Sequence, residues 1–132
     1  MTQEQRSIPA PEVYPGTEEY WNGAREGKLL VRYCNSCEAP HHYPRPICPR
    51  CGSDDTYFQE ASGGGTIYSF SVMWRAPVPY AIAYVTLDGT DISMMTNIVD
   101  CDLSKLAIGQ KVTLTFTETE GDGPPVPTFT PA

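Results

Sequence analysis

Four cysteines in two Cys-x-x-Cys pairs constrain this chain more than any other feature. They are Cys34, Cys37, Cys48 and Cys51, with ten residues between the two pairs. Two such pairs bring four thiolates to one point, and tetrahedral Zn²⁺ prefers soft ligands of this kind. The spacing therefore predicts a structural Zn²⁺ ion, with iron in the same knuckles or disulfides as the alternatives. Because all four ligands come from the protein, no coordination position remains for substrate.

Composition places the chain among ordinary single-domain proteins. Its 132 residues are 40% hydrophobic, which is enough for one modest core. No apolar run approaches the roughly 18 residues of a membrane span, and no signal segment opens the sequence. We therefore expect a cytoplasmic protein without a membrane partner, in a compartment where reduced thiols favour metal over disulfides.

The net charge of −7 argues against nucleic acid as a partner. Residues 1–53 hold six basic and six acidic residues, whereas residues 54–132 hold three basic and ten acidic ones. General binding to a phosphate backbone needs a basic stripe, which this sequence lacks.

The chain divides into three predicted parts. They are an N-terminal arm and helix over 1–27, a zinc ribbon over 28–60 and a barrel domain over 61–132. The polar, Pro-rich start predicts an untethered arm. Thr17 predicts the N-cap of a short helix, in which Tyr20, Trp21 and Ala24 share one face. That face either packs on its own domain or docks a partner.

The second half of the chain has the pattern of several short strands. Alternation over 68–74 predicts a half-buried strand with Tyr68 and Phe70 in the core, and the apolar run 81–87 predicts a central strand. Further strands are expected over 92–98 and 112–116, with a Pro-containing edge strand over 126–129. The glycines of 63–65 predict a flexible turn before the first strand. The overall prediction is a mainly β protein with a short helix, a rubredoxin-like ribbon and a five-stranded OB-fold barrel.

A series of motifs along the chain resembles a known family. These are Tyr20-Trp21-Asn-Gly, Tyr33-Cys-x-x-Cys37, Pro44-Arg-Pro-x-Cys-Pro-x-Cys-Gly-Ser53, Gly63-x-Gly-Thr-Ile-Tyr-Ser-Phe70, Arg75-Ala-Pro77, Pro79-Tyr80, Thr96-Asn97 and Ile108-Gly109-Gln. Together they are similar to the zinc-ribbon/OB-fold proteins formerly described as a domain of unknown function. The resemblance covers about residues 17–131. One departure is Glu38, which stands where many relatives have glycine.

The resemblance implies a function without catalysis by this chain. Members are accessory subunits of thiolase-superfamily enzymes, namely acyltransferases, thiolases and aldolases that cleave acyl-CoAs. They contribute to the acyl-CoA binding site, while the nucleophile lies in the partner. A thiolase-like or acyl-CoA lyase subunit is therefore the expected partner, and two copies of this chain in a hetero-oligomer would be ordinary symmetry.

The residues themselves offer no catalytic group for an independent enzyme. Cys101 lies between Asp100 and Asp102, which raise a thiol pKa and so weaken the nucleophile. His41 and His42 are adjacent in the ribbon loop, where we expect solvent exposure or a hydrogen bond within the ribbon or to a ligand. We therefore predict no catalytic residue in this chain.

Isolated cations and aromatic residues are the candidate acyl-CoA contacts. Coenzyme A presents phosphates and a flat adenine, which call for Arg or Lys and for a stacking surface. We predict that Trp74, Arg75 and Tyr80 line such a surface, with Arg45 nearby. The alternatives to the accessory subunit are a stand-alone acyl-CoA or lipid-binding module and, less favoured by charge, a single-stranded nucleic-acid binder.

Overall fold

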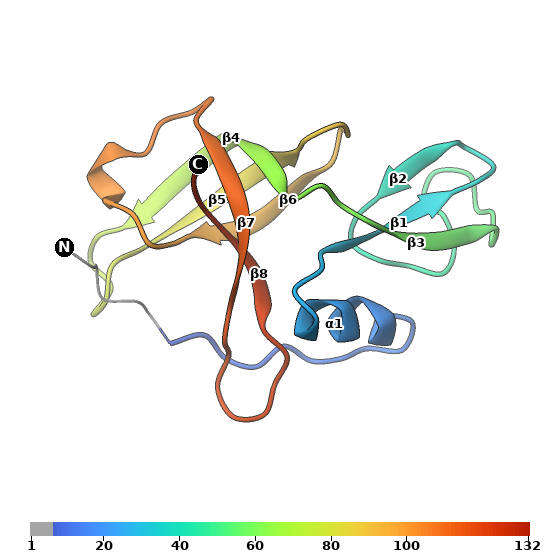
Figure 1. The fold of residues 1–132 in the computed structure, drawn as a ribbon, viewed down its shortest axis with the longest axis horizontal. Coiled ribbons are helices and arrows are strands. Elements are labelled where there is room, and N and C mark those ends of the chain that lie inside the picture. The colour runs from blue at the N-terminus through green and yellow to red at the C-terminus, as the bar shows by residue number, and fades with distance from the viewer. Residues whose placement is uncertain (1–6) are drawn as a thin grey trace.

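Two β-sheets and one α-helix make up residues 7–132, the part of the chain that the computed structural model describes. A three-stranded sheet lies at one end of the molecule and a closed barrel at the other. The helix α1 lies beneath the joint between them (Figure 1). Residues 7–132 contain no helix with the length and hydropathy of a membrane span.

The first sheet is the predicted ribbon. It contains the strands β1 (Leu30–Cys34), β2 (Ala39–His41) and β3 (Thr56–Glu60) in the order β2-β1-β3. All its pairings are antiparallel, and Cys34 lies opposite both Ala39 and Thr56. The register therefore places the end of β1, where the first cysteine pair begins, at the centre of the sheet.

The helix α1 (Glu18–Arg25) forms where its residues predict it. The carbonyl of Thr17 accepts from Trp21 N at 3.2 Å. The Thr17 hydroxyl does not cap the helix; it donates instead to the Tyr14 carbonyl at 2.6 Å. The predicted face of Tyr20, Trp21 and Ala24 is buried in the main core of the chain itself. The helix therefore uses this face for its own packing and not for a partner.

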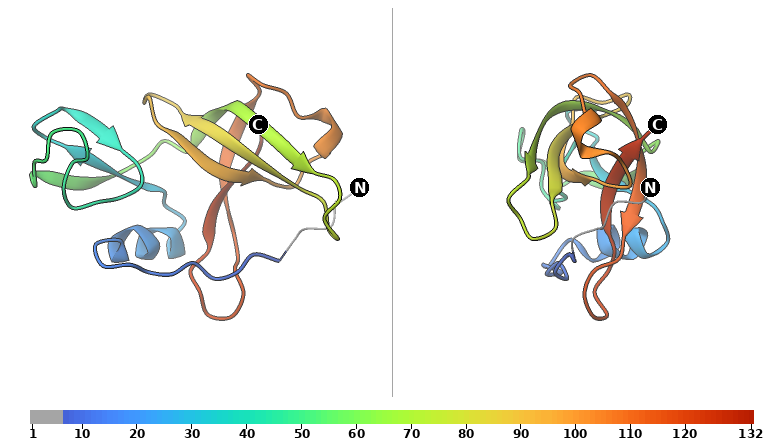
Figure 2. Two further views of the ribbon diagram at one scale, coloured as in Figure 1. Left: turned by 180° about the vertical axis from the view of Figure 1, so that it is seen from behind. Right: turned by 90° about the vertical axis from the view of Figure 1, so that its left-hand side faces the viewer.

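The N-terminal arm is attached from Ser7 onward, contrary to the prediction of an untethered segment. It runs along the underside of the molecule to the loop between β7 and β8 (Figure 2). There Glu120 N donates to the Ile8 carbonyl at 2.9 Å, and Ser7 Oγ donates to Glu120 at 2.7 Å. The arm is attached because backbone groups of the loop remain free to pair with it. Residues 1–6, the rest of the predicted arm, lie outside the described residues.

The second sheet closes on itself in the order β4-β5-β6-β8-β7. Its strands are β4 (Gly64–Met73), β5 (Tyr80–Leu87), β6 (Ser93–Ile98), β7 (Lys111–Thr117) and β8 (Val126–Pro131), with the 3₁₀ helix η1 (Leu103–Lys105) between β6 and β7. Pairing of β4 with β7 completes the barrel. The predicted fold class is confirmed: a mainly β chain with one short helix, a four-cysteine ribbon and a five-stranded OB-fold barrel.

A β-bulge in β4 overturns the prediction that Tyr68 is a core residue. The pairing with β5 shifts between Ile67 and Ser69, so Ile67 points inward at 1% exposure while Tyr68 is 67% exposed. The extra residue changes the inward phase of the strand. Phe70, also predicted as core, is partly buried and packs against it.

The glycine run before the barrel is part of a strand, not a flexible turn. Gly64 and Gly65 begin β4, and Gly65 is buried. A Cβ at Gly65 would lie 2.5 Å from Val85 Cγ1, so the residue must be glycine for β4 and β5 to approach this closely. Only residues 61–63 therefore connect the ribbon to the barrel.

The last strand, β8, occupies an interior place in the barrel and not the predicted edge. It pairs with β7 over six residues but with β6 only at Ile98 and Phe129, in parallel. Proline cannot donate to a ladder, which explains this thin pairing. Instead, the Thr96 hydroxyl donates to the Pro127 carbonyl at 2.9 Å. Phe129 is fully buried, so the strand contributes its largest side chain to the core.

Candidate functional site

The four predicted ligand cysteines come together at one end of the ribbon. Cys34 ends β1 and Cys37 follows in the adjoining turn, while Cys48 and Cys51 belong to the loop before β3. Their four sulfur atoms all lie within 4.8 Å of one another. The Sγ atoms of Cys34 and Cys51 are 3.7 Å apart, and those of Cys37 and Cys48 are 3.8 Å apart.

These distances fit a tetrahedral metal ion. With metal–sulfur bonds of about 2.3 Å, a tetrahedral ion separates its sulfur ligands by about 3.8 Å. Backbone amides support the sulfur atoms, since Cys37 N donates to Cys34 Sγ and Arg50 N donates to Cys48 Sγ, both at 3.4 Å. The four cysteines are therefore positioned to bind Zn²⁺ in a closed structural site.

Backbone amides also adjust the acidity of one of the ligands, Cys48. Backbone N–H groups of Cys51 and Arg50 lower the pKa of the Cys48 thiol to about 7. An amide hydrogen bond stabilises the charged thiolate, which is the form that binds metal. The local backbone of the second knuckle thus prepares Cys48 as a ligand.

The two histidines are packed inside the ribbon and not exposed as a solvated loop. His41 is 4% exposed, and its Nε2 is 3.4 Å from the Arg45 carbonyl. The partly buried His42 contacts the rings of Tyr20 and Tyr43. Burial lowers the pKa of His41 and lowers that of His42 to about 4. Both rings are therefore neutral near pH 7, and the alternative of a hydrogen bond within the ribbon holds for His41.

The structure separates the predicted acyl-CoA contacts into two groups. Trp74, Arg75 and Tyr80 lie together, because Met73 at the end of β4 pairs with Tyr80 at the start of β5. Their loop is at the end of the barrel away from the ribbon, whereas Arg45 lies in the ribbon (Figure 1). The ten residues of β4 separate them, a length of about 30 Å. Arg45 is therefore not next to the other three.

The ribbon and the turn between β5 and β6 approach each other. Arg50 Nη2 lies 3.7 Å from Asp91 Oδ1, with both side chains largely exposed. Arg50 Nη2 also donates to the Pro40 carbonyl at 3.2 Å. This arginine therefore serves the joint between the two sheets.

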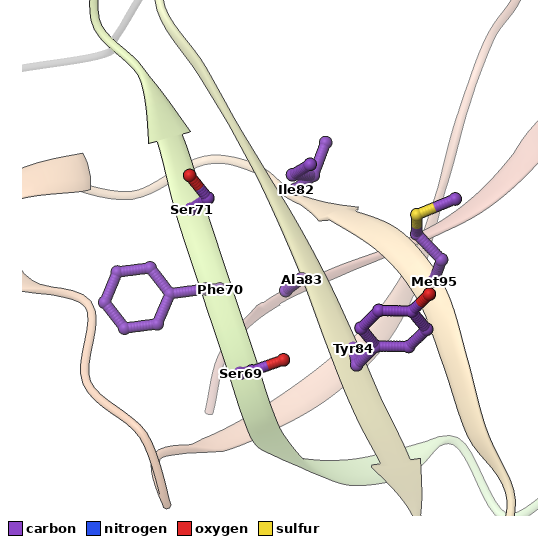
Figure 3. Close-up of a pocket in the computed structure, with 7 residues that line it drawn as sticks. All are labelled: Ser69, Phe70, Ser71, Ile82, Ala83, Tyr84 and Met95. Atoms are coloured by element: carbon purple, nitrogen blue, oxygen red, sulfur yellow. The ribbon is translucent and has the colours of Figure 1, made fainter.

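The outer face of β4, β5 and β6 is a surface that the sequence analysis did not identify. Its outward residues surround a shallow cavity of about 160 Å³. The cavity lies between Ser69 and Ser71 of β4 and the side chains of Tyr84 and Met95 on β5 and β6 (Figure 3). The signal was present in the run 80–87, because its even-numbered residues point outward while its odd-numbered residues are buried.

Cys101 has the character predicted from its neighbours. The residue is half-buried and lies outside the four-cysteine cluster. Burial, followed by the charges of Asp102 and Asp100, raises the pKa of its thiol. A protonated thiol is a weak nucleophile, so Cys101 lacks the activation that catalysis requires.

The fold and the cysteine centre define a class: a four-cysteine zinc ribbon followed by an OB-fold barrel. Two family models match this chain. "ChsH2, rubredoxin-like zinc ribbon domain" matches residues 21–56, and "ChsH2, C-terminal OB-fold domain" matches residues 58–117. The chain belongs to the ChsH2/DUF35 family.

Two curated relatives show different extents of similarity. A "Probable enoyl-CoA hydratase alpha subunit" of Thermomonospora curvata is 33% identical over 130 residues, covering 94% of this chain but 40% of that relative. A "DUF35 domain-containing scaffold protein" of Methanothermobacter thermautotrophicus is 30% identical over 97 residues, covering 68% of this chain and 72% of the relative. The chain thus spans less than half of the first relative.

One solved structure resembles the chain over nearly its whole length. It is the "Ltp2-ChsH2(DUF35) aldolase", with a TM-score of 0.81 and 31% sequence identity. The match covers 92% of this chain and 98% of the matched chain. The similarity therefore includes the ribbon and the barrel together.

Proposed function

We propose that this chain is a non-catalytic accessory subunit that binds a thiolase-superfamily enzyme and helps to form its acyl-CoA binding site. The observation that carries the proposal is the likeness to a chain of an aldolase named for two components, Ltp2 and ChsH2(DUF35). The scaffold description of the archaeal relative is consistent with the same role.

The chemistry of the described residues is consistent with a non-catalytic subunit. The four clustered cysteines fill a closed metal site, and His41 and His42 are neutral and packed. The thiol of Cys101 is held in its protonated form near pH 7. In this proposal the nucleophile, and the choice between condensation, cleavage and acyl transfer, belong to the partner.

The loop between β4 and β5 is the proposed contact with acyl-CoA. Trp74 is 57% exposed, and the neighbouring Arg75 is also exposed. An exposed indole can stack on adenine, and a guanidinium can bind phosphate oxygens in a bidentate manner. Tyr80 begins the next strand, opposite Met73 at the end of β4. Arg45, which lies in the ribbon, would make a separate contact with the complex.

A stand-alone acyl-CoA module is less well supported. Pockets that enclose small molecules usually measure about 300–1,000 Å³. The cavity on β4–β6 measures about 160 Å³, which is too small to enclose coenzyme A. In this proposal, another protein therefore completes the binding site.

A reconstituted complex provides the test. A thiolase-superfamily enzyme from the same organism, co-expressed with this protein, should co-purify with it and bind acyl-CoA. Arg75→Ala should weaken acyl-CoA binding by about tenfold, the loss expected for one charge-assisted phosphate contact. Lys105→Ala, which removes another exposed cation of the barrel, serves as the control and should leave affinity unchanged. Equal affinity and turnover in wild type and Arg75→Ala would remove this residue from the site.

A further inference from the structure

Four neighbouring strands of the barrel, β4, β5, β6 and β8, carry no charged residue; β8 is largely buried, so the exposed uncharged surface is that of β4–β6. The sequences of β4, β5 and β6 are GGTIYSFSVM, YAIAYVTL and SMMTNI. The whole chain has nine basic and sixteen acidic residues. On an antiparallel sheet with one face in solvent, charged side chains normally occupy outward positions. Their absence from three adjacent strands indicates a surface that is covered by another molecule.

The outward side chains have the composition of a protein interface. Tyr84 and Met95 face each other across β5 and β6 and are 46% and 63% exposed. Ile82 lies next to them on the same face of β5. Tyr and Met are enriched at interfaces and charged residues are depleted at their centres. The outward side chains of β4–β6 therefore differ in composition from an ordinary solvent-exposed surface.

Three polar side chains on this face, those of Thr86, Ser93 and Asn97, already have partners within the sheet. The hydroxyls of Thr86 and Ser93 are 2.8 Å apart, and Asn97 Nδ2 donates to the Ala81 carbonyl at 2.9 Å. A polar group with an internal partner costs less to remove from water than an unpaired one. The face can therefore be covered without leaving these groups unsatisfied.

The shallow cavity on this face has the size of a side chain. The cavity measures about 160 Å³ and lies between the serines of β4 and the larger side chains of β5 and β6 (Figure 3). Interfaces take much of their binding energy from single side chains that fill such pockets. An apolar or aromatic side chain of a partner fits here, while coenzyme A does not.

We infer that the outer face of β4–β6 is the surface that binds the enzyme subunit, with one apolar side chain of that subunit in the cavity. This inference rests on the proposed function and identifies where the partner docks. A second copy of this chain is the poorer occupant, because each copy has a net charge of −7. Two such copies repel each other, and an uncharged face offers no opposite charge to offset the repulsion. The occupant is therefore a different protein whose own face is apolar and which is less acidic.

Lysine substitutions on this face test the inference by co-purification with the co-expressed thiolase-superfamily enzyme. Ile82→Lys and Met95→Lys should each weaken the complex by at least about tenfold, since a lysine buried in an apolar interface loses its hydration. Ile108→Lys is the matched control, because Ile108 is 71% exposed but lies outside this face. Thermal unfolding of each variant verifies that the barrel is intact.

Methionine oxidation gives a second readout that needs no substitution. Dilute peroxide should oxidise Met95 in the free chain and react at least about tenfold more slowly in the complex. Met94 is 3% exposed and provides the internal reference, because it should react slowly in both states. Unchanged oxidation of Met95 in a complex that has formed would overturn the inference.

The outcomes separate this inference from the proposed function. If wild type forms the complex and Ile82→Lys and Met95→Lys bind equally well, the docking surface is wrong while the accessory role stands. If wild type forms no complex, both the proposed function and this inference are wrong. If the isolated chain forms a dimer that Met95→Lys dissociates, the occupant is a second copy and the inference is overturned.

Discussion

The ribbon and the barrel are stabilised in different ways. The ribbon has three strands of three to five residues, and large side chains such as Tyr57 and Ile47 remain 42% and 53% exposed. The barrel has strands of six to ten residues around residues such as Val85 and Phe129, which are fully buried. A small sheet with so little apolar burial cannot offset its conformational entropy alone. In the ribbon, where Leu29, Val31 and the partly buried Phe58 are the residues that reach the main core, a bound metal would supply much of the stability. In the barrel, hydrophobic packing supplies it.

The helix α1 packs against both the ribbon and the barrel. Tyr20 and Trp21 of α1 are in the same core cluster as the barrel residues, and the Tyr20 ring also contacts His42 and Tyr43 of the ribbon. The connection through residues 61–63 is short. Loss of one half should therefore reach the other through α1 and its aromatic contacts, and through Leu29 and Val31, which belong to the same core cluster as the barrel residues.

Removal of the metal should have the largest effect, because it should unfold the ribbon and leave the barrel folded. Structural Zn²⁺ sites contribute on the order of 10 kcal/mol to folding, so Cys48→Ser or a strong chelator should unfold the ribbon. Amide hydrogen exchange should then show lost protection in β1–β3 and retained protection in β5. Cys101→Ser makes the same chemical change outside the cluster and should keep both the metal and the ribbon. A folded ribbon in metal-free Cys48→Ser would contradict the structural role.

Truncation of a barrel core residue should destabilise the barrel and leave the metal site of the ribbon intact. Phe129→Ala should lower the free energy of unfolding by about 3–5 kcal/mol, because Phe129 is fully buried and its loss leaves a cavity. Phe116→Ala on β7 is the matched control, with a smaller expected loss because Phe116 is partly exposed. Urea denaturation measures both, and zinc content should stay unchanged. Loss of zinc in Phe129→Ala would show that the ribbon depends on the barrel core.

Acid should weaken the joint through His42. Its folded pKa of about 4 lies below the ordinary 6.5 because burial disfavours the charged ring and the neighbouring His41 adds to this. The unfolded chain therefore binds more protons between these values, so stability is complete above pH 6.5 and falls as the pH drops toward 4. The loss is at most about 3 kcal/mol. The rings that face His42 are those of Tyr20 on α1 and of Tyr43 in its own loop.

The variant His42→Phe isolates this contribution. Wild type and His42→Phe should show unfolding free energies that diverge between pH 6.5 and 4, with the smaller pH dependence in the variant. Excess Zn²⁺ in both samples keeps metal release from dominating the comparison. Parallel pH profiles for the two proteins would show that His42 does not sense acid.

The sequence determined the local features that depend on near neighbours. The two Cys-x-x-Cys pairs defined the metal site, because two residues between ligands suffice to form each knuckle. Alternation predicted the barrel strands and with them the OB-fold class, and helix signals predicted α1. The low reactivity of Cys101 followed from its two flanking carboxylates.

Only the tertiary structure decided which surfaces are buried and which side chains meet. A one-residue bulge turned Tyr68 outward, and closure of the barrel brought β8 between β6 and β7 despite its prolines. Packing of α1 on the ribbon buried histidines that local sequence would leave in solvent. Arg45 and Arg75 were separated by the length of β4, and the uncharged face of β4–β6 emerged only when three strands lay side by side. These features depend on contacts between residues far apart in the chain, and periodicity within a single segment contains no information about such contacts.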